Sequence, residues 1–371
     1  MDVSDVEAIP IEMDVKSLEE NDGIAPYRSS RGPGTGTKQR IIIRIDLENG
    51  ITGWGEMRLL FTPEISVQMI EDVVAPRILG HPVWDIGALQ GEFFSEYIRI
   101  SPFLGGVEMA MWDAFGKTLD APVHQLLGGK QQDKVSFAYC LGILDPDKSR
   151  THAQHVKERG FDVLKTKAGR DWQEDVDRIL AMYDAVDGSL EFRLDPNQAW
   201  TFEEAVRVGA KLEDAGVYLQ YFEQPIRIDN VGGFKRLRQR LQTPIGANED
   251  MYYPHNLFQL VKEDAIDVGI VDMNPAGGIS AMRDLASVAH DAGISISHHC
   301  SWDLGIKTAA VVHAVSAMPP VNLPSDTVYF SWKDHIIESP FEFNDGRIDV
   351  PDEPGLGVAV RESKIAEYRI E

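Results

Sequence analysis

Short apolar runs alternate with amphipathic helical stretches along most of the chain after residue 130. Eight such runs occur, and a helical stretch of roughly a dozen residues follows nearly every one. Strands that alternate with helices predict a parallel sheet, and eight of them predict a closed (β/α)8 barrel of the TIM type. An open doubly wound sheet is the competing arrangement, but no Gly-x-Gly-x-x-Gly turn opens any of these helices. The strands are predicted at 135–140, 162–167, 190–195, 218–223, 245–249, 268–273, 294–299 and 320–325.

The pattern before residue 130 is different and predicts a separate α+β domain. Apolar and polar residues alternate in three short segments, and Asn49-Gly50 supplies the hairpin turn between the last two. The periodicity then becomes helical from Ser66 to Leu127. The three strands are predicted at 6–11, 39–47 and 51–57.

These patterns divide the chain into three parts. Residues 1–130 are predicted to form an α+β capping domain, and residues 131–335 the catalytic barrel. Residues 336–371 are predicted to return to the capping domain as short strands and turns. The capping domain is therefore expected to contain both ends of the chain.

A stretch rich in glycine and proline interrupts the capping domain between residues 22 and 38. Its composition disfavours regular structure and predicts a mobile flap, with an ordinary exposed hairpin loop as the alternative. Tyr27, Arg28 and Arg31 lie in this flap. Because the flap carries cations, we interpret it as a lid over an anionic ligand that these three residues help to bind.

Composition limits the classes of function. The 59 acidic and 36 basic residues give a formal net charge of −23, which disfavours binding to nucleic acid or to an anionic membrane. An apolar fraction of 43% is typical of a globular protein, and no run is apolar and long enough to span a bilayer. Cys140 and Cys300 give no disulfide framework, and the acidic N-terminus lacks the basic region of a signal peptide, so we expect a cytoplasmic protein. We also expect identical chains to associate into a homo-oligomer.

The segment 190–225 has the pattern strand–helix–strand, and each strand ends in a carboxylate. Asp195 ends the first strand, Asn197 follows two residues later, and Glu223 ends the second strand. The ends of parallel strands lie at one edge of a sheet, so these oxygens would suit a hard divalent cation such as Mg2+. The alternative is a helix-capping aspartate and a solvated glutamate.

The next predicted strand ends in the run Asn248-Glu249-Asp250. Glu223 follows Asp195 by 28 residues and Glu249 follows Glu223 by 26, each the length of one strand–helix unit. Three acids at three neighbouring strand ends predict a metal site more readily than a coincidence of helix caps.

Lys165 and Lys167 lie at the end of the second predicted barrel strand. Alternation directs both side chains to the same side, which in a barrel strand is the interior or its mouth. Two buried neighbouring lysines are costly unless negative groups face them or one of them is neutral. We therefore interpret Lys167 as a base whose pKa Lys165 helps to lower, with two surface lysines at a frayed strand end as the alternative.

Asp272 ends the sixth predicted strand, and His298-His299 ends the seventh. A carboxylate one strand away from a histidine is typical of an acid–base dyad, in which the aspartate orients the imidazole and makes it more basic. One of the two histidines is therefore predicted to be catalytic, with Asp272 as its partner.

Together these motifs resemble the enolase superfamily, and within it the group of mandelate racemase. The resemblance extends over nearly the whole chain, including the capping domain and the C-terminal return. The motifs that carry it are Lys165-Thr-Lys167-Ala-Gly, Leu-Asp195-Pro-Asn197-Gln, Phe-Glu223-Gln-Pro, Asp272 before Gly277-Gly278, and Met-Ala-Met-Trp-Asp followed by Leu-Leu-Gly-Gly.

The resemblance implies Mg2+ bound by Asp195, Glu223 and a third ligand. It also implies two bases, Lys167 and the histidine of a His–Asp dyad, on opposite faces of the substrate. Members of the superfamily abstract a proton alpha to a carboxylate, and the metal stabilises the resulting enediolate.

Two features depart from the racemase pattern. Mandelate racemase places a glutamate acid after the eighth strand, whereas this chain has Asp326 in the run Asn-Leu-Pro-Ser-Asp-Thr. That run and Trp302-Asp-Leu-Gly-Ile look more like glucarate dehydratase. The third metal ligand is Glu249 in the racemase pattern and Asn248 in the dehydratase pattern. We favour Glu249, because three carboxylates hold a divalent cation better than two carboxylates and an amide.

The sequence thus predicts a Mg2+-dependent dehydratase of a small carboxylate substrate, a sugar acid. Lys167 or His299 removes the alpha proton, and His299 or an acid near Asp326 helps the beta hydroxyl to leave, which gives a 2-keto-3-deoxy acid. As the histidine of the dyad, His299 fits the racemase alignment, and His298 could fit the glucarate dehydratase alignment. We expect His298 and Asn197 to contact the substrate. A racemase or epimerase with the same two bases is the alternative, and a non-catalytic acid-sugar binder is the remote one.

Overall fold

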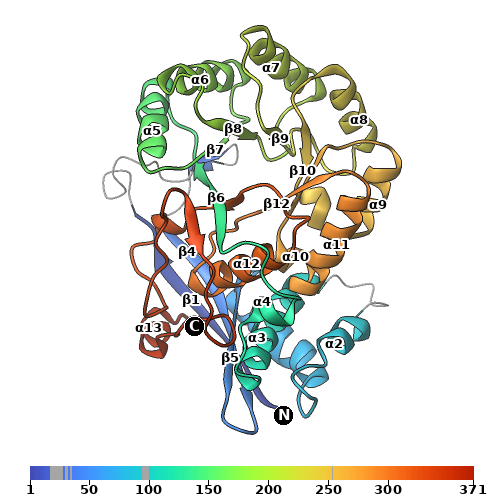
Figure 1. The fold of residues 1–371 in the computed structure, drawn as a ribbon, viewed down its shortest axis with the longest axis vertical. Helices are drawn as coiled ribbons and strands as arrows, with labels where there is room; N and C mark the ends of the chain where they lie inside the picture. Colours follow the sequence, from blue (N-terminus) through green and yellow to red (C-terminus); the bar gives the residue numbers. More distant parts are fainter. Residues whose placement is uncertain (17–27, 30–31, 34–35, 94–99, 253) are drawn as a thin grey trace.

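A barrel and a smaller domain packed beneath it make up the structure in Figure 1. The computed structural model describes residues 1–16, 28–29, 32–33, 36–93, 100–252 and 254–371. Within these ranges, every helix is too short or too polar to cross a membrane.

Eight parallel strands form the predicted barrel, which confirms the fold class. Neighbouring strands are hydrogen-bonded in the order β12-β11-β10-β9-β8-β7-β6-β13. The ring is nearly closed: β12 and β13 form no ladder, but the Leu323 amide donates to the Ile296 carbonyl at 3.0 Å across the seam between them. The strands are β6 (Lys134–Leu141), β7 (Val163–Lys167), β8 (Glu191–Asp195), β9 (Tyr221–Glu223), β10 (Ile245–Ala247), β11 (Val268–Val271), β12 (Ser295–His298) and β13 (Ser325–Thr327).

Helices follow the barrel strands and cover the outside of the ring (Figure 1). In α7 the local sequence explains the helix. Thr201 and Glu204 form a capping box at its start, and Ala205, Val208 and Leu212 recur at helical spacing on its buried face. The barrel helices are α5 (Pro146–Glu158), α6 (Trp172–Ala185), α7 (Phe202–Asp214), α8 (Val231–Arg240), α9 (Pro254–Lys262), α10 (Met273–Ala276), α11 (Ile279–Asp291) and α12 (Gly305–Ala317).

The eighth barrel strand lies further along the chain than predicted. The predicted span was 320–325, whereas β13 is Ser325–Thr327. Proline has no amide to donate to a ladder, so Pro320 and Pro324 keep the preceding residues out of the sheet. As a consequence Asp326 lies inside the strand and not after it.

The capping domain packs a three-stranded antiparallel sheet, in the order β1-β4-β5, against helices. β5 lies close to α3 because Gly53 and Gly55 face it, and a Cβ atom on either would collide with the backbone oxygens of Ala110 or Gly106. The elements are β1 (Val3–Asp14), β4 (Thr37–Leu47), β5 (Thr52–Arg58), α1 (Pro63–Gln68), the π-helix η1 (Met69–Val74), the 3-10 turn η2 (Ala75–Arg77), α2 (Ile86–Glu92), α3 (Ser101–Thr118) and α4 (Val123–Leu126).

The predicted flap is only partly within the described residues. Two short strands, β2 (Arg28–Ser29) and β3 (Gly32–Pro33), pair in antiparallel fashion. Tyr27 and Arg31 lie outside the described residues, and so does the side chain of Arg28. Their role in substrate binding stays a prediction.

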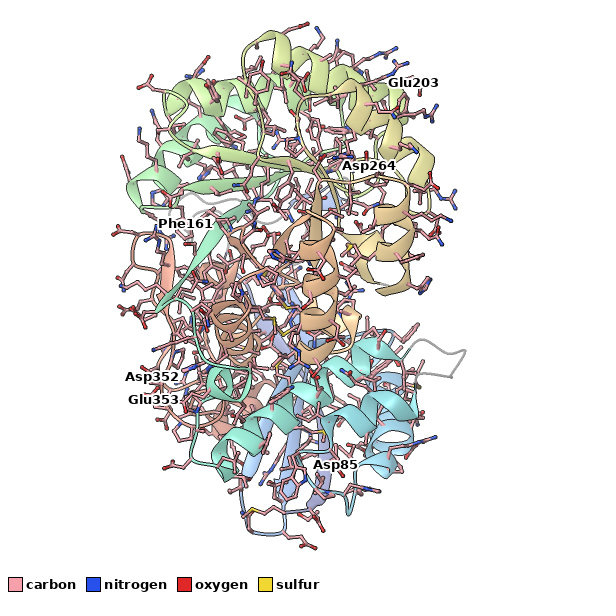
Figure 2. The ribbon with its side chains drawn as sticks, turned by 45° about the vertical axis from the view of Figure 1, so that its right-hand side comes forward. Asp85, Phe161, Glu203, Asp264, Asp352 and Glu353 are labelled. Atoms are coloured by element: carbon pink, nitrogen blue, oxygen red, sulfur yellow. The ribbon has the colours of Figure 1, made fainter. Side chains whose placement is uncertain are left out.

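The C-terminal segment contacts both domains. Its strand β14 (Arg347–Asp349) pairs with the start of β6, and Asp352, labelled in Figure 2, bonds to Lys130 at 2.9 Å. The chain ends in a helix, α13 (Glu362–Tyr368), where only short strands and turns were predicted. After this helix, the Ile370 amide donates to the Pro10 carbonyl on β1 at 3.0 Å, so the end of the chain lies on the capping sheet.

Two buried acids of the capping domain cap the first turns of barrel helices. Glu108 on α3 accepts hydrogen bonds from the amides of Ile279 and Ser280 at the start of α11. Glu56 on β5 accepts from the amides of Leu304 and Lys307 at the start of α12. Burial raises the pKa of each carboxyl to about 7. The two domains are therefore joined by acids that titrate near neutrality.

We expect Glu108 to stabilise the folded protein less as the pH rises from 4.5 to 7. Glu108 has a reference pKa of 4.5 when unfolded, but in the folded chain it keeps its proton up to about pH 7. Below pH 4.5 this effect contributes up to about 3 kcal/mol to the free energy of unfolding. The contribution is lost as the pH rises from 4.5 through 7. In urea unfolding, the free energy of unfolding of the native protein relative to Glu108→Gln should therefore fall as the pH rises across this range. Glu203→Gln, on the exposed surface of α7 (Figure 2), should keep the native slope; equal slopes for all three proteins would contradict the assignment.

Candidate active site

A cavity of about 380 Å3 lies at the C-terminal ends of the barrel strands, where the barrel faces the capping domain. The end of β5 forms part of its wall through Arg58 and Leu59, together with Arg40 of β4. The predicted site residues that line it are Lys165, Lys167, Asn197, Glu249, His299 and Asp326. The sequence motifs from five separate barrel segments thus meet around one space.

Lys165 is enclosed by acids inside the barrel. Its ammonium donates to Glu223 and to Asp326, both at 2.6 Å, and lies 3.4 Å from Asp195. Burial by itself would lower the pKa of Lys165, but Asp326, Glu223 and Asp195 outweigh that effect and raise it well above the ordinary value. Lys165 is therefore a fixed positive charge next to Lys167.

Lys167 lies in a network built by the loop after β8. Its ammonium contacts Asp195 and donates to the Asn197 side-chain oxygen at 2.8 Å. The Asn197 amide in turn donates to Asp195 at 2.9 Å. Asn197 and Gln198 both have left-handed backbones, at φ 48° and 70°, which non-glycine residues rarely adopt. Such local strain is typical of functional sites, and here it aims Asn197 at Lys167.

Arg193 is a residue of the site that was not predicted from the sequence. It lies on β8 two residues before Asp195, so alternation directs both side chains to the same side. The guanidinium is completely buried and donates to Asp326 at 2.9 Å. The same alternation that identified Lys165 and Lys167 could have identified Arg193.

Asp326 differs from its predicted role. It was expected after the eighth strand as a possible proton donor, but it lies within β13 with its two oxygens bound by Lys165 and Arg193. Burial alone would raise the pKa of this carboxyl, but Lys165 and Arg193 outweigh that effect and lower it. Asp326 is therefore an ionised anchor for Lys165, which argues against a role as the acid.

The metal-binding prediction is consistent with surplus negative charge at the strand ends. The Glu223 atom Oε2 is buried and has no hydrogen-bond partner among the described residues. Burial, followed by repulsion from Asp195, raises the pKa of Glu223 well above its usual value. The pKa of Asp195 is lowered, because Lys167 and Lys165 outweigh the effect of burial. Carboxylate oxygens that lack compensation are the donors that a hard divalent cation prefers, so these residues fit Mg2+.

The two candidates for the third metal ligand, Glu249 and Asn248, lie in different surroundings. Glu249, in the 3-10 turn η3 (Glu249–Tyr252), lines the cavity, and its Oε1 accepts from Gln198 at 3.0 Å. Asn248 is buried in the barrel wall, where its amide nitrogen donates to the Ile270 carbonyl at 3.0 Å. This placement favours Glu249.

One compact group of metal-ligating atoms is present among the described residues. Donor atoms of Glu223, His299 and Asp326 all lie within 4.8 Å of one another. The group shares Glu223 with the predicted set. Asp195 and Asp326 each lie against two cations, so we retain Asp195, the ligand predicted from the sequence, as the partner of Glu223 in metal binding.

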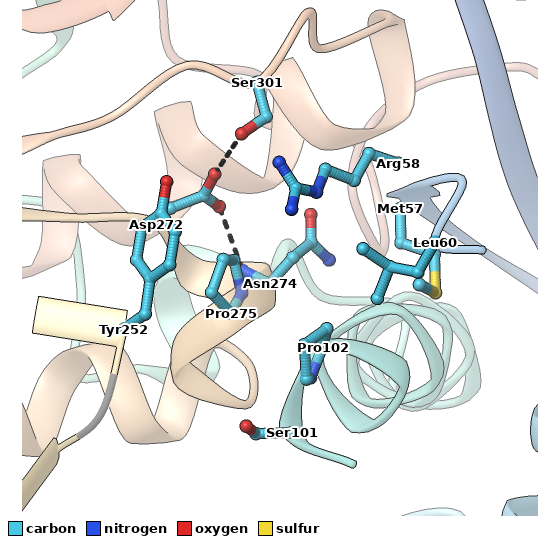
Figure 3. A pocket seen from close by; sticks show the side chains of 10 residues that line it. All are labelled: Met57, Arg58, Leu60, Ser101, Pro102, Tyr252, Asp272, Asn274, Pro275 and Ser301. Carbon is cyan, nitrogen blue, oxygen red and sulfur yellow. Dashed lines mark hydrogen bonds between the residues drawn. The ribbon is translucent and has the colours of Figure 1, made fainter. Parts of the chain in front are cut away.

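His299 and Asp272 lie side by side. The His299 Nδ1 is 3.4 Å from Asp272 Oδ2, which also accepts from the Ser301 hydroxyl at 2.6 Å. Figure 3 shows the bonds that Asp272 makes to Ser301 and Asn274. His298, by contrast, is completely buried, and its ring nitrogen accepts from the Met273 amide at 3.5 Å. Burial lowers the pKa of His298 to about 4. The structure thus does not support His298 as a substrate ligand and places His299 in the dyad.

A second, smaller cavity of about 150 Å3 adjoins the first on the Asp272 side (Figure 3). Arg58, Tyr252 and Ser301 line both cavities. These three residues were not predicted from the sequence, because none of them is part of a recognised motif. They enlarge the polar surface that a substrate would meet.

Comparisons with known proteins agree with this geometry. The model for the mandelate racemase / muconate lactonizing enzyme N-terminal domain matches residues 12–128, and the enolase C-terminal domain-like model matches residues 148–364. Arabinonate dehydratase from Saccharolobus solfataricus is 28% identical over 89% of this chain and 90% of its own length. L-Ala-D/L-Glu epimerase from Bacillus subtilis is 29% identical over 87% and 89%.

Solved structures show the same likeness in three dimensions. The muconate lactonizing enzyme from Pseudomonas fluorescens, solved with muconolactone, superposes with a TM-score of 0.90 at 27% identity, covering 100% of this chain and 99% of that one. These relatives include a dehydratase, an epimerase and a lactonizing enzyme, so family membership leaves the individual reaction open. With both domain models matched in sequence order, this chain is an enzyme of the enolase superfamily, in the mandelate racemase / muconate lactonizing enzyme group.

Proposed function

We propose that this enzyme dehydrates a sugar acid to a 2-keto-3-deoxy acid. The observation that carries the proposal is the polar cavity between two acid–base groups, Lys167 and His299. Lys167 ends β7 and His299 follows β12, so they enter the cavity from distant parts of the ring. A substrate between them would present opposite faces to the two groups.

The cationic groups of the site would orient the substrate carboxylate. Lys165 supplies a fixed positive charge, and Asn197 holds the Lys167 ammonium at 2.8 Å. Asp195, Glu223 and Glu249 are the residues that would hold Mg2+. When bound, such an ion would act as a Lewis acid toward the carboxylate and make the alpha proton more acidic.

The proposed reaction has two parts. Lys167 in its neutral form, or His299, takes the alpha proton as a general base. The bond from the beta carbon to its hydroxyl then breaks, and the hydroxyl leaves as water with a proton from His299. The enol that remains loses its hydroxyl proton and gains a proton at the beta carbon, which gives the 2-keto-3-deoxy acid. Asp326 takes no part as a donor, since Lys165 and Arg193 hold it ionised.

Epimerisation is the second candidate function. The same two groups could remove the alpha proton from one face and return it to the other, and the epimerase from Bacillus subtilis is 29% identical to this chain. Dehydration is favoured by the polar lining, because Asn197, Tyr252 and Ser301 offer hydrogen bonds to several hydroxyl groups.

A panel of five- and six-carbon sugar acids, assayed with Mg2+, tests the proposal. We expect at least one of them to yield a ketone that forms a semicarbazone. The same incubations in D2O report alpha-hydrogen exchange by NMR. Exchange with inverted stereochemistry and no ketone across the panel would show that the enzyme is an epimerase. Neither ketone nor exchange with any sugar acid would contradict the proposed dehydration.

A further inference from the structure

Lys307 is a buried charge that the proposed reaction does not use. It lies on α12 with only 1% of its surface exposed, and it does not line the cavity. Its ammonium donates to Asp272 and to Asp303, each at 2.8 Å. A buried lysine destabilises the folded state unless acids compensate its charge. One of the two acids that compensate Lys307 is Asp272, the aspartate of the dyad, which links Lys307 to the acid–base group.

The bonds to Asp272 are divided between its two oxygens. Oδ1 accepts from the Lys307 ammonium at 2.8 Å and from the Asn274 amide at 3.1 Å. Oδ2 accepts from the Ser301 hydroxyl and faces His299. Lys307 and Asn274 therefore hold the carboxylate by one oxygen and present the other to the imidazole.

Both residues that hold Oδ1 are themselves bound by Glu56 of the capping domain. The Glu56 side chain accepts from the Lys307 amide at 2.9 Å, and the Glu56 carbonyl accepts from the Asn274 side chain at 3.0 Å. The N-cap residue of α12, Leu304, has no side chain that could cap the helix, so the Glu56 carboxyl takes that place. A continuous set of hydrogen bonds thus joins β5 of the capping domain to the dyad.

We propose that Lys307 and Glu56 are positioning residues that orient Asp272, and through it His299, so that the capping domain sets the geometry of one of the two acid–base groups. This inference rests on the proposed role of His299 in catalysis. Lys307 acts through Asp272 and does not touch the substrate. The alternative is that Lys307 only compensates two buried acids.

The first arm of the test does not need a substrate. Ring 15N NMR signals of His299 are assigned by their loss in His299→Asn, among the 10 histidines of the chain. A dyad in which Nδ1–H is donated to Asp272 gives the signals of a single tautomer. We expect Lys307→Met and Glu56→Gln to move these signals toward a mixture of tautomers. Unchanged signals in both variants would overturn the proposal.

The second arm uses turnover. With an active sugar acid, Lys307→Met should lower kcat about 10- to 100-fold and leave KM within about threefold, because misplacing a reacting group affects the chemical step more than binding. Alpha-hydrogen exchange by Lys167 should persist. Equal loss of the steps assigned to Lys167 and to His299 would indicate a merely structural role and overturn the inference.

Lys117→Met is the matched control. Lys117 on α3 also bonds to an aspartate four residues earlier, Asp113, at 2.7 Å, but it lies in the capping domain away from the dyad. It should leave the His299 signals and kcat unchanged. Glu56→Gln keeps the proposal testable if Lys307→Met does not fold. If the NMR arm succeeds and no sugar acid is turned over by the native enzyme, the proposed function fails while the positioning role stands.

Discussion

Replacing Lys167 by methionine should lower kcat/KM for the active sugar acid by about 10²- to 10⁴-fold, the range of a lost general acid–base group. Methionine keeps the length and apolar stem of the side chain but cannot accept a proton. Lys167 lines the cavity, where Asp195 and Asn197 hold its nitrogen, and the fixed charge of Lys165 lies 3.4 Å from the same Asp195. Steady-state rates of ketone formation are the measurement.

Variants of Lys167 and His299, single and combined, also separate the two candidate reactions. An epimerase needs a group on each face, so losing either Lys167 or His299 should stop turnover, while exchange of one stereoisomer survives. For a dehydratase, Lys167→Met combined with His299→Asn should give no ketone. Lys134→Met serves as the control, because Lys134 begins β6 at the opposite end of the barrel and pairs with Asp349. Near-native turnover in the Lys167 variant would show that the base has been misassigned.

Loss of the charge on Asp195 should weaken Mg2+ binding well over tenfold, since a hard cation depends on carboxylate charge. Titration calorimetry of the Asp195→Asn and Glu223→Gln variants measures this directly. Each variant also leaves a buried lysine with less compensation, so its folding must be checked by thermal unfolding first.

Further variants identify the remaining ligand. Glu249→Gln should lower the affinity if Glu249 binds the ion and leave it nearly intact if Asn248 does. His299→Asn should have little effect, unless the ion prefers the compact group of Glu223, His299 and Asp326. Unchanged affinity in both the Asp195 and Glu223 variants would rule out the strand-end site.

The strand-end residues were predictable because alternation and spacing are local properties of a sequence. Lys165 and Lys167 face inward for the same reason that Arg193 and Asp195 do, yet Arg193 was missed because no motif drew attention to it. The position of Asp326 was missed because the strand was predicted to begin before Pro324.

Contacts between the domains were beyond the reach of such patterns. Glu56 and Lys307 are 251 residues apart, and nothing near either residue indicates the other. Lys307 sits in a helix whose residues are nearly all buried, so its sequence has no polar face that would reveal a partner. The flap residues Tyr27 and Arg31 lie outside the described residues, so their part in substrate binding stays a prediction.

The seam between β12 and β13 gives Arg193 a mechanical role. Its guanidinium donates to the Ser297 hydroxyl on β12 at 3.3 Å and to Asp326 on β13 at 2.9 Å. A side chain from β8, on the opposite side of the ring, thus clamps together the two strands that share no ladder. Peptide hydrogen bonds do not titrate, whereas this clamp depends on the charge of Asp326. Beside His299 the ring is therefore held by an ion pair in addition to the backbone hydrogen bond between Leu323 and Ile296.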